Sequence, residues 1–265
     1  MITNTGFTDT DFASMLNEYN YNLHPGDIVA GTIFNHESKG FLVDIGASIA
    51  GYLPIEEISL RNYTHKYNIN HLQNETREFF IIAYNRHSKQ LILSIKRLEY
   101  IRAWKRIKQL ESEDIILRLT IQGINKGGII TILEGIQGFI PNSHLTLNIN
   151  KIQVTNTLLK CKLLLANEKN NQLILSNKKA ILSLSANKLK IGEIVEGEVI
   201  KIETYGIFVQ IKQTNIPALL HISEIGYDNI PNISNIFSIG DWIIIKIIHI
   251  DMEQGRISVS RRNIN

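Results

Sequence analysis

The sequence predicts an all-β protein of three small closed barrels, because it combines a threefold repeat, a period-two hydrophobic pattern and regularly spaced glycines. In each repeat a glycine precedes, by eleven or twelve residues, a small residue followed by two apolar ones; these glycines are Gly40, Gly127 and Gly206. Each repeat closes on a similar strand, and the closing strands are Gln90–Ser94, Gln172–Ser176 and Arg256–Ser260. Several short strands in a unit of about seventy residues favour a barrel, because closure removes exposed sheet edges.

In order along the chain, the pattern predicts seven segments. Thr8 or Thr10 begins a short helix over residues 8–18. In residues 96–111 apolar side chains recur every third position between basic ones, which predicts an amphipathic connecting helix. The segments are an N-terminal helical segment 1–25, a first barrel 26–97, a helical linker 98–111, a second barrel 112–179, a linker 180–190, a third barrel 191–262 and a tail 263–265.

Composition limits the classes of function. The net charge is +3 with a pI near 8.8, so any nucleic-acid binding must come from local patches. The single Cys161 excludes a disulfide framework, and the most apolar run, Ile243–Ile250, is too short to cross a bilayer. We expect no membrane partner. Ile, Asn and Lys, residues with AT-rich codons, are abundant, which suggests the hypothesis of an AT-rich genome such as a plastid's. The location we expect is the plastid stroma, with a bacterial cytoplasm as the alternative.

Motifs for catalysis are missing from the sequence. It contains no phosphate-binding loop, no nucleophile elbow and no metal-binding pair of histidines or cysteines. His65 and His71 lie close together, but in a polar segment without carboxylate or thiolate support. We therefore expect no catalytic residue, no metal, no cofactor and no small-molecule substrate, so that the protein is not an enzyme.

The third repeat carries the pattern most informative about function. If Ile207 and Val209 face the core, the period of two places Phe208 on the outer face, where a base can stack on it. The same face would carry Tyr205, His221 and Arg256, the last following Asp251. Aromatic rings with a cation on a barrel face are typical of single-stranded nucleic-acid binding. Alternatively, Phe208 caps the barrel end and Tyr205 covers a loop.

The first two repeats have different residues in these slots. The slot of Phe208 is assigned to Leu42 and Ile129, which cannot stack. The slot of Tyr205 is assigned to Lys39 and Lys126, which predicts phosphate contacts. Two further aromatic residues align with Leu219, either as replacement stacking surfaces or as plain core packing; they are Tyr52 and Phe139.

These residues resemble a known family. Gly192–Gly197, Tyr205–Val209, Leu220–Ile225 and Gly255–Ser260 are similar to the RNA-binding module named after small-subunit ribosomal protein S-one. Over residues 6–263 the chain resembles the short, three-module cyanobacterial and chloroplast form, through Gly6-Phe7-Thr8, Asn74–Phe80, Ser94–Arg97 and Tyr100–Trp104.

The resemblance implies an OB fold for each module, binding of single-stranded messenger RNA on the small ribosomal subunit, and a role in initiating translation. It implies that the RNA-contacting positions are Tyr205, Phe208, His221, Asp251 and Arg256. The first two modules depart from this pattern, with Pro54 and Pro141 for the histidine, Asn85 and Asn167 for the aspartate, and Gln90 and Gln172 for the arginine. The first module is therefore assigned mainly to protein contacts with the ribosome; ribosomal RNA contacts are an additional option.

Three other functions stay open on the residues alone. The same barrels would suit a free RNA chaperone or a transcription-associated factor. A ribonuclease is a second option, although no segment of the chain is left over for a nuclease domain. A protein-interaction scaffold is the third, and it predicts no affinity for oligoribonucleotides.

Overall fold

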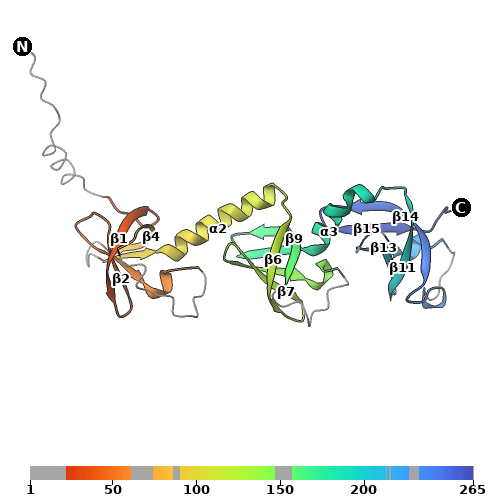
Figure 1. The fold of residues 1–265 in the computed structure, drawn as a ribbon, viewed down its shortest axis with the longest axis horizontal. Helices are drawn as coiled ribbons and strands as arrows, with labels where there is room; N and C mark the ends of the chain where they lie inside the picture. Colours follow the sequence, from red (N-terminus) through yellow and green to blue (C-terminus); the bar gives the residue numbers. More distant parts are fainter. Residues whose placement is uncertain are drawn as a thin grey trace, which may run out of the picture. The chain divides into compact units, whose positions relative to one another are not determined.

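The computed structural model describes residues 22–60, 74–85, 90–146, 157–212, 214, 216–226 and 233–264. They form three five-stranded closed barrels (Figure 1), as the sequence predicts. The predicted helix over residues 8–18 and the pair His65 and His71 lie outside the described residues.

The first barrel consists of β1 (Ile28–Glu37), β2 (Gly40–Asp44), β3 (Gly51–Pro54), β4 (Thr76–Asn85) and β5 (Gln90–Ser94). Its strands close in the order β1-β2-β3-β5-β4. The pairing of β3 with β5 is parallel, and all other pairings are antiparallel. This five-stranded arrangement is that of an OB fold.

The other two barrels repeat this topology. The second consists of β6 (Leu117–Ile124), β7 (Gly128–Leu133), β8 (Ile136–Pro141), β9 (Leu158–Asn167) and β10 (Gln172–Ser176). The third consists of β11 (Ile194–Glu203), β12 (Gly206–Ile211), β13 (Pro217–His221), β14 (Trp242–Asp251) and β15 (Arg256–Ser260). A single parallel pairing again joins the third and fifth strands of each barrel.

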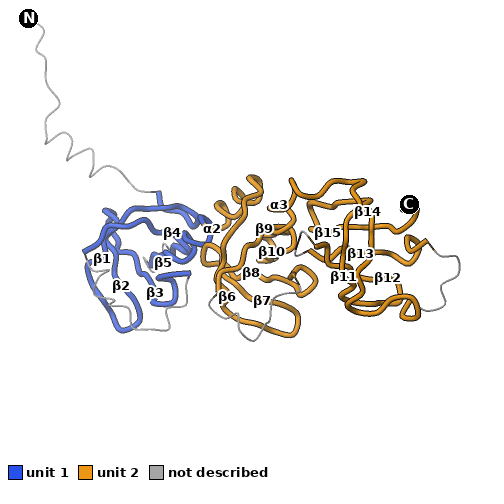
Figure 2. The backbone as a smooth tube through the Cα atoms, turned by 45° about the vertical axis from the view of Figure 1, so that its right-hand side comes forward, with its two compact units in different colours: residues 1–102 blue, residues 103–265 orange. Residues whose placement is uncertain are grey.

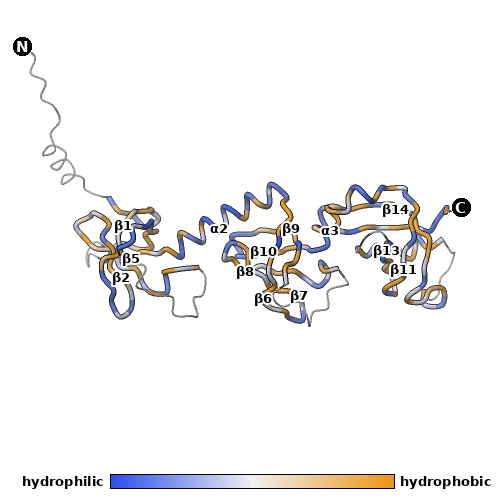
Figure 3. Tube along the Cα trace, in the orientation of Figure 1, coloured by the Kyte–Doolittle hydropathy of each residue, from blue (hydrophilic) through white to orange (hydrophobic). Residues whose placement is uncertain are grey.

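Alternation along the strands builds each core. In β12, Ile207, Val209 and Ile211 are fully buried, whereas Phe208 and Gln210 between them are half-buried. This is the strand period that the sequence shows, and hydrophobic and hydrophilic stretches are interspersed along every barrel (Figure 3). The side chains between the core positions therefore form the outer faces.

Helices connect the barrels. Helix α2 (Ile95–Ser112) follows β5, and its Trp104 and Ile107 are fully buried. Helix α3 (Asn177–Ser185) follows β10 and continues into the short 3-10 helix η5 (Ala186–Lys188). None of the helices in the described ranges is long and apolar enough to span a membrane.

The chain comprises two compact units, residues 1–102 and 103–265 (Figure 2). The second unit contains two barrels that share helix α3. The Ser176 side chain accepts the N–H of Lys179 and thereby caps the start of this helix, while Leu182 belongs to the core of the third barrel. Helix α3 is thus a structural part of both barrels rather than a free linker.

Candidate nucleic-acid interface

The outer face of the third barrel is formed by β12, β13 and β15. Phe208 is paired with Leu219, and Leu219 with Ser258, so these three side chains form one row across the face. Two residues along the same strands from this row, Gly206 is paired with His221. The structure therefore places Phe208 on the outer face in mid-strand, as the alternation predicts.

The first cluster on this face contains Tyr205, Phe208 and His221. The rings of Tyr205 and Phe208 meet edge to face, with centroids 6.3 Å apart, and Tyr205 is 46% exposed. The Tyr205 carbonyl accepts the N–H of Ile222 at 2.9 Å, which fixes the turn before β12. Two aromatic rings at this separation offer flat surfaces on which unpaired bases can stack.

The orientation of His221 is fixed by a residue that sequence reasoning missed. His221 Nδ1 accepts the backbone N–H of Ser223 at 3.3 Å and lies 2.8 Å from the Ser223 hydroxyl. With Nδ1 an acceptor, Nε2 carries the proton of the neutral ring and is a hydrogen-bond donor. The His-x-Ser spacing was the available signal for this interaction.

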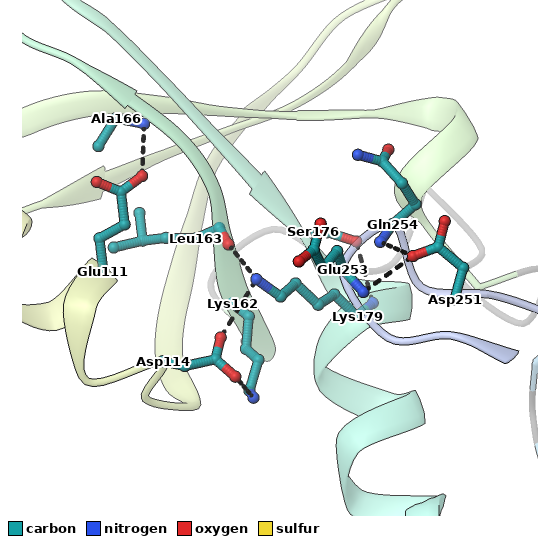
Figure 4. Close-up of polar contacts among 10 residues, drawn as sticks. All are labelled: Glu111, Asp114, Lys162, Leu163, Ala166, Ser176, Lys179, Asp251, Glu253 and Gln254. Atoms are coloured by element: carbon teal, nitrogen blue, oxygen red, sulfur yellow. Dashed lines mark hydrogen bonds and ion pairs between the residues drawn. The ribbon is translucent and has the colours of Figure 1, made fainter.

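The second cluster lies at the start of β15. Asp251 and Arg256 are paired across the turn between β14 and β15. Asp251 Oδ1 accepts the N–H groups of Glu253 and Gln254 at 3.0 and 2.9 Å, so its carboxylate shapes the turn (Figure 4). Arg256 is exposed and forms no ion pair with any residue in the described part of the chain. Its guanidinium group is thus free to bind an anion.

The first and second barrels also carry one aromatic residue in the central row, but on the neighbouring strand. Leu42 is paired with Tyr52, and Ile130 with Phe139, whereas Phe208 is paired with Leu219. All six side chains are half-buried on the outer faces. Tyr52 and Phe139 are therefore outer-face residues and not core residues.

The predicted alignment of the second barrel was wrong by one residue. Ile129 is fully buried, and the outer slot belongs to Ile130. Gly128 rather than Gly127 corresponds to Gly206, because a Cβ on Gly128 would lie 2.1 Å from the Ile140 carbonyl oxygen, as one on Gly206 would lie 2.4 Å from that of Leu220.

The counterpart of Tyr205 is therefore Gly127 and not Lys126. The Gly127 carbonyl accepts the N–H of Asn142 at 2.8 Å, the bond that Tyr205 forms with Ile222. In the first barrel, the Lys39 carbonyl accepts the N–H of Ile55, so the alignment of Lys39 with Tyr205 is correct. Lys39 and Lys126 are both exposed.

The side chains on the outer face of the third barrel are suited to binding. Aromatic rings, a histidine donor and an unpaired guanidinium are groups of the kind that bind bases and phosphates. Within the described ranges no group of three or more His, Cys, Asp or Glu could hold a metal ion. Cys161 is buried, and burial raises the pKa of its thiol to about 12. It therefore stays protonated and unreactive.

Comparison with known proteins agrees with this geometry. The S1 RNA binding domain family matches residues 23–96 and 188–262, the first and third barrels. The second barrel has the same strand topology although it lies outside the matched segments. The fold and these matches define a protein of repeated S1 domains.

Similarity to full-length proteins narrows the class to one family. The small ribosomal subunit protein bS1c of Pyropia yezoensis is 51% identical over 265 residues, covering 98% of each chain. Protein bS1A of Synechocystis is 43% identical over 98% of this chain and 78% of its own length. Protein bS1c of Spinacia oleracea is 33% identical over 97% of this chain and 62% of its own. The chain belongs to the bS1 family of small ribosomal subunit proteins.

Proposed function

We propose that this chain is a constituent of the plastid small ribosomal subunit that holds single-stranded messenger RNA and promotes translation initiation. The ribosomal role rests on membership of the bS1 family and the plastid location on the bS1c relatives. One observation supports the third barrel as the main RNA reader. Its outer face combines the Tyr205–Phe208 pair, the oriented His221 and the unpaired Arg256.

Each side chain has a distinct role in the proposal. Phe208 and Tyr205 stack with bases, each stacked base contributing about 1–3 kcal/mol. His221 donates a hydrogen bond to a base or to the sugar-phosphate backbone, and Arg256 binds a phosphate. Asp251 holds the turn that positions Arg256.

The first two barrels contribute less to base recognition. They have proline at the position of His221 and glutamine at that of Arg256; these residues are Pro54, Pro141, Gln90 and Gln172. Lys39 and Lys126 supply phosphate contacts, and the first barrel contacts ribosomal proteins. Weak sites on one chain raise each other's effective concentration, so a long RNA should bind more tightly than a short one.

Fluorescence anisotropy with a labelled, unstructured oligoribonucleotide tests the proposal. The full chain is compared with the double variant Phe208→Ala/His221→Ala at two salt concentrations. We expect the double variant to lose about tenfold or more in affinity, since a stacked base contributes about 1–3 kcal/mol, the His221 hydrogen bond is lost as well, and about 1.4 kcal/mol corresponds to tenfold.

Trp242→Ala is the matched control, because Trp242 is a 57% exposed aromatic residue on β14, outside the proposed face. Equal binding by wild type and double variant would move base recognition elsewhere. Absence of RNA binding by the wild type would favour a protein scaffold. If the wild type binds RNA but does not co-sediment with small subunits at moderate salt, a free RNA chaperone is favoured.

A further inference from the structure

The turn between β14 and β15 lies directly against the start of helix α3. A Cβ on Gly255 would lie 2.6 Å from the Lys179 nitrogen and 2.9 Å from the Lys178 carbonyl carbon, and Gly255 has a φ of +68°. Only glycine meets both conditions without strain. Figure 4 shows Glu253 and Gln254 of this turn beside Ser176 and Lys179. Arg256, the residue after Gly255, is thereby held close to the second barrel.

Positive groups face each other at this junction. Lys178 is half-buried, and its Nζ donates to the Ser143 carbonyl at 2.7 Å. Burial and the charge of Arg256 lower the pKa of Lys178. Burial, Arg256 and Lys178 also lower the pKa of His144, in this order of importance. The positive charges of Lys178 and Arg256 therefore repel each other, and both disfavour protonation of His144.

Neither Lys178 nor Arg256 forms an ion pair with a nearby acid of the described residues. Asp251 is occupied by the two N–H groups of its own turn. Asp114 is paired with Lys162 and Lys179, the second at 3.2 Å.

The equivalent site of the first barrel is built differently. There Lys96 Nζ lies 3.4 Å from the Glu56 carbonyl, as Lys178 lies near that of Ser143. The position of His144 is held by Glu57, which accepts the Ser94 hydroxyl at 2.6 Å, whereas His144 Nδ1 lies 3.1 Å from that of Ser176. Two carboxylates of the first barrel are thus replaced in the second by Ser143 and His144.

We propose that Lys178 and Arg256 together bind one phosphate of an RNA strand that passes from the third barrel to the second. The inference rests on the proposed RNA function and adds a site to it. Arg256 lies at the start of β15, at one end of the outer face that carries Phe208. Lys178 lies next to the turn before β15, at the start of helix α3 beside the second barrel. Lys126 lies further along, because Asn142 Nδ2 donates to its carbonyl at 2.7 Å beside Ser143. A phosphate between the two cations relieves their repulsion and forms charge-assisted hydrogen bonds.

Lys178→Gln is the first test, with Lys96→Gln as the matched control in the first barrel. Both remove an ammonium group at the same position of the fold. For an unstructured oligoribonucleotide bound to the full chain, we expect Lys178→Gln to lose about three- to tenfold in affinity. We also expect its salt slope to fall by about 0.7, the value for one phosphate on a single strand. Lys96→Gln should stay within about twofold of wild type.

His144→Glu is the second test, because it introduces the carboxylate that the first barrel has in this position. The Glu57–Ser94 bond shows that the fold accommodates glutamate beside this serine. We expect a loss similar to that of Lys178→Gln, and no further loss in the double variant, since both changes remove the same phosphate contact. Thermal melting of each variant separates loss of binding from loss of fold.

The outcomes separate the site from the function. If Phe208→Ala weakens binding but Lys178→Gln behaves like Lys96→Gln, the junction site is wrong and the proposed function stands. A His144→Glu variant that folds and binds as wild type would likewise overturn the site. If the wild type binds no RNA, the proposed function itself fails.

Discussion

The outer faces of the second and third barrels share their strand topology but carry different side chains. Pro141 and His221 occupy the same position with φ and ψ of −60° and 149° in one and −67° and 150° in the other. The central row combines an aliphatic and an aromatic residue in both, but the aromatic ring lies on β8 in the second barrel and on β12 in the third. The scaffold therefore preserves the slots, and the side chains decide how strongly each barrel binds RNA.

The equivalence of positions in the second and third barrels depends on the corrected register of the second barrel. Stability measurements test this register, and they have the largest expected effect. Ile129→Ala should lower the free energy of unfolding by about 3 kcal/mol, because Ile129 is fully buried and truncation leaves a cavity. Ile130→Ala should lower it by about 1 kcal/mol, because Ile130 is half-buried. Denaturant unfolding of both variants measures the difference. The reverse order would put Ile129 on the outer face and restore Lys126 as the counterpart of Tyr205.

The fold could be predicted from sequence because its signals are local. Alternation in strands such as Gly206–Ile211 and the repeated closing strands identify the barrels without any long-range contact. The error arose where the second repeat has two adjacent glycines, Gly127 and Gly128. Only the close approach of the Ile140 carbonyl selects Gly128, and that contact joins two different strands.

A histidine placed in the second barrel at the position of His221 tests whether this side chain accounts for the difference in RNA binding between the two barrels. Pro141→His should raise the affinity for RNA about two- to threefold, because Ser143 stands where Ser223 orients His221. Pro54→His in the first barrel is the control, since Glu56 replaces that serine and its negative charge repels phosphate. Anisotropy on both variants measures the gain. An equal gain in both would show that orientation by serine is unimportant.

The candidate site was predictable in part. Phe208 and its outward orientation follow from the strand period, and the slots of Tyr52 and Phe139 follow from the repeat. Two features could not be predicted. Asp251 binds two N–H groups of its own turn, and Gly255 contacts the backbone of helix α3 across more than seventy residues of chain. Such contacts depend on how the barrels are joined, which hydrophobic periodicity does not encode.

The smallest expected effect concerns the pH dependence of stability at His144, where the second barrel differs from Glu57 of the first and Glu224 of the third. Burial, Arg256 and Lys178 lower the pKa of His144 below its ordinary 6.5. The unfolded chain therefore takes up a proton near pH 6.5, whereas the folded chain resists it. This contribution to stability is complete above pH 6.5 and is lost as the pH falls through the folded pKa.

Between pH 7.5 and 5.5, the melting temperature of the wild type should fall about 1–3 °C more than that of His144→Gln. His249→Gln, at an exposed position of β14, should behave as wild type. Equal slopes for wild type and His144→Gln would mean that neither burial nor the cations at the junction lower the pKa of His144.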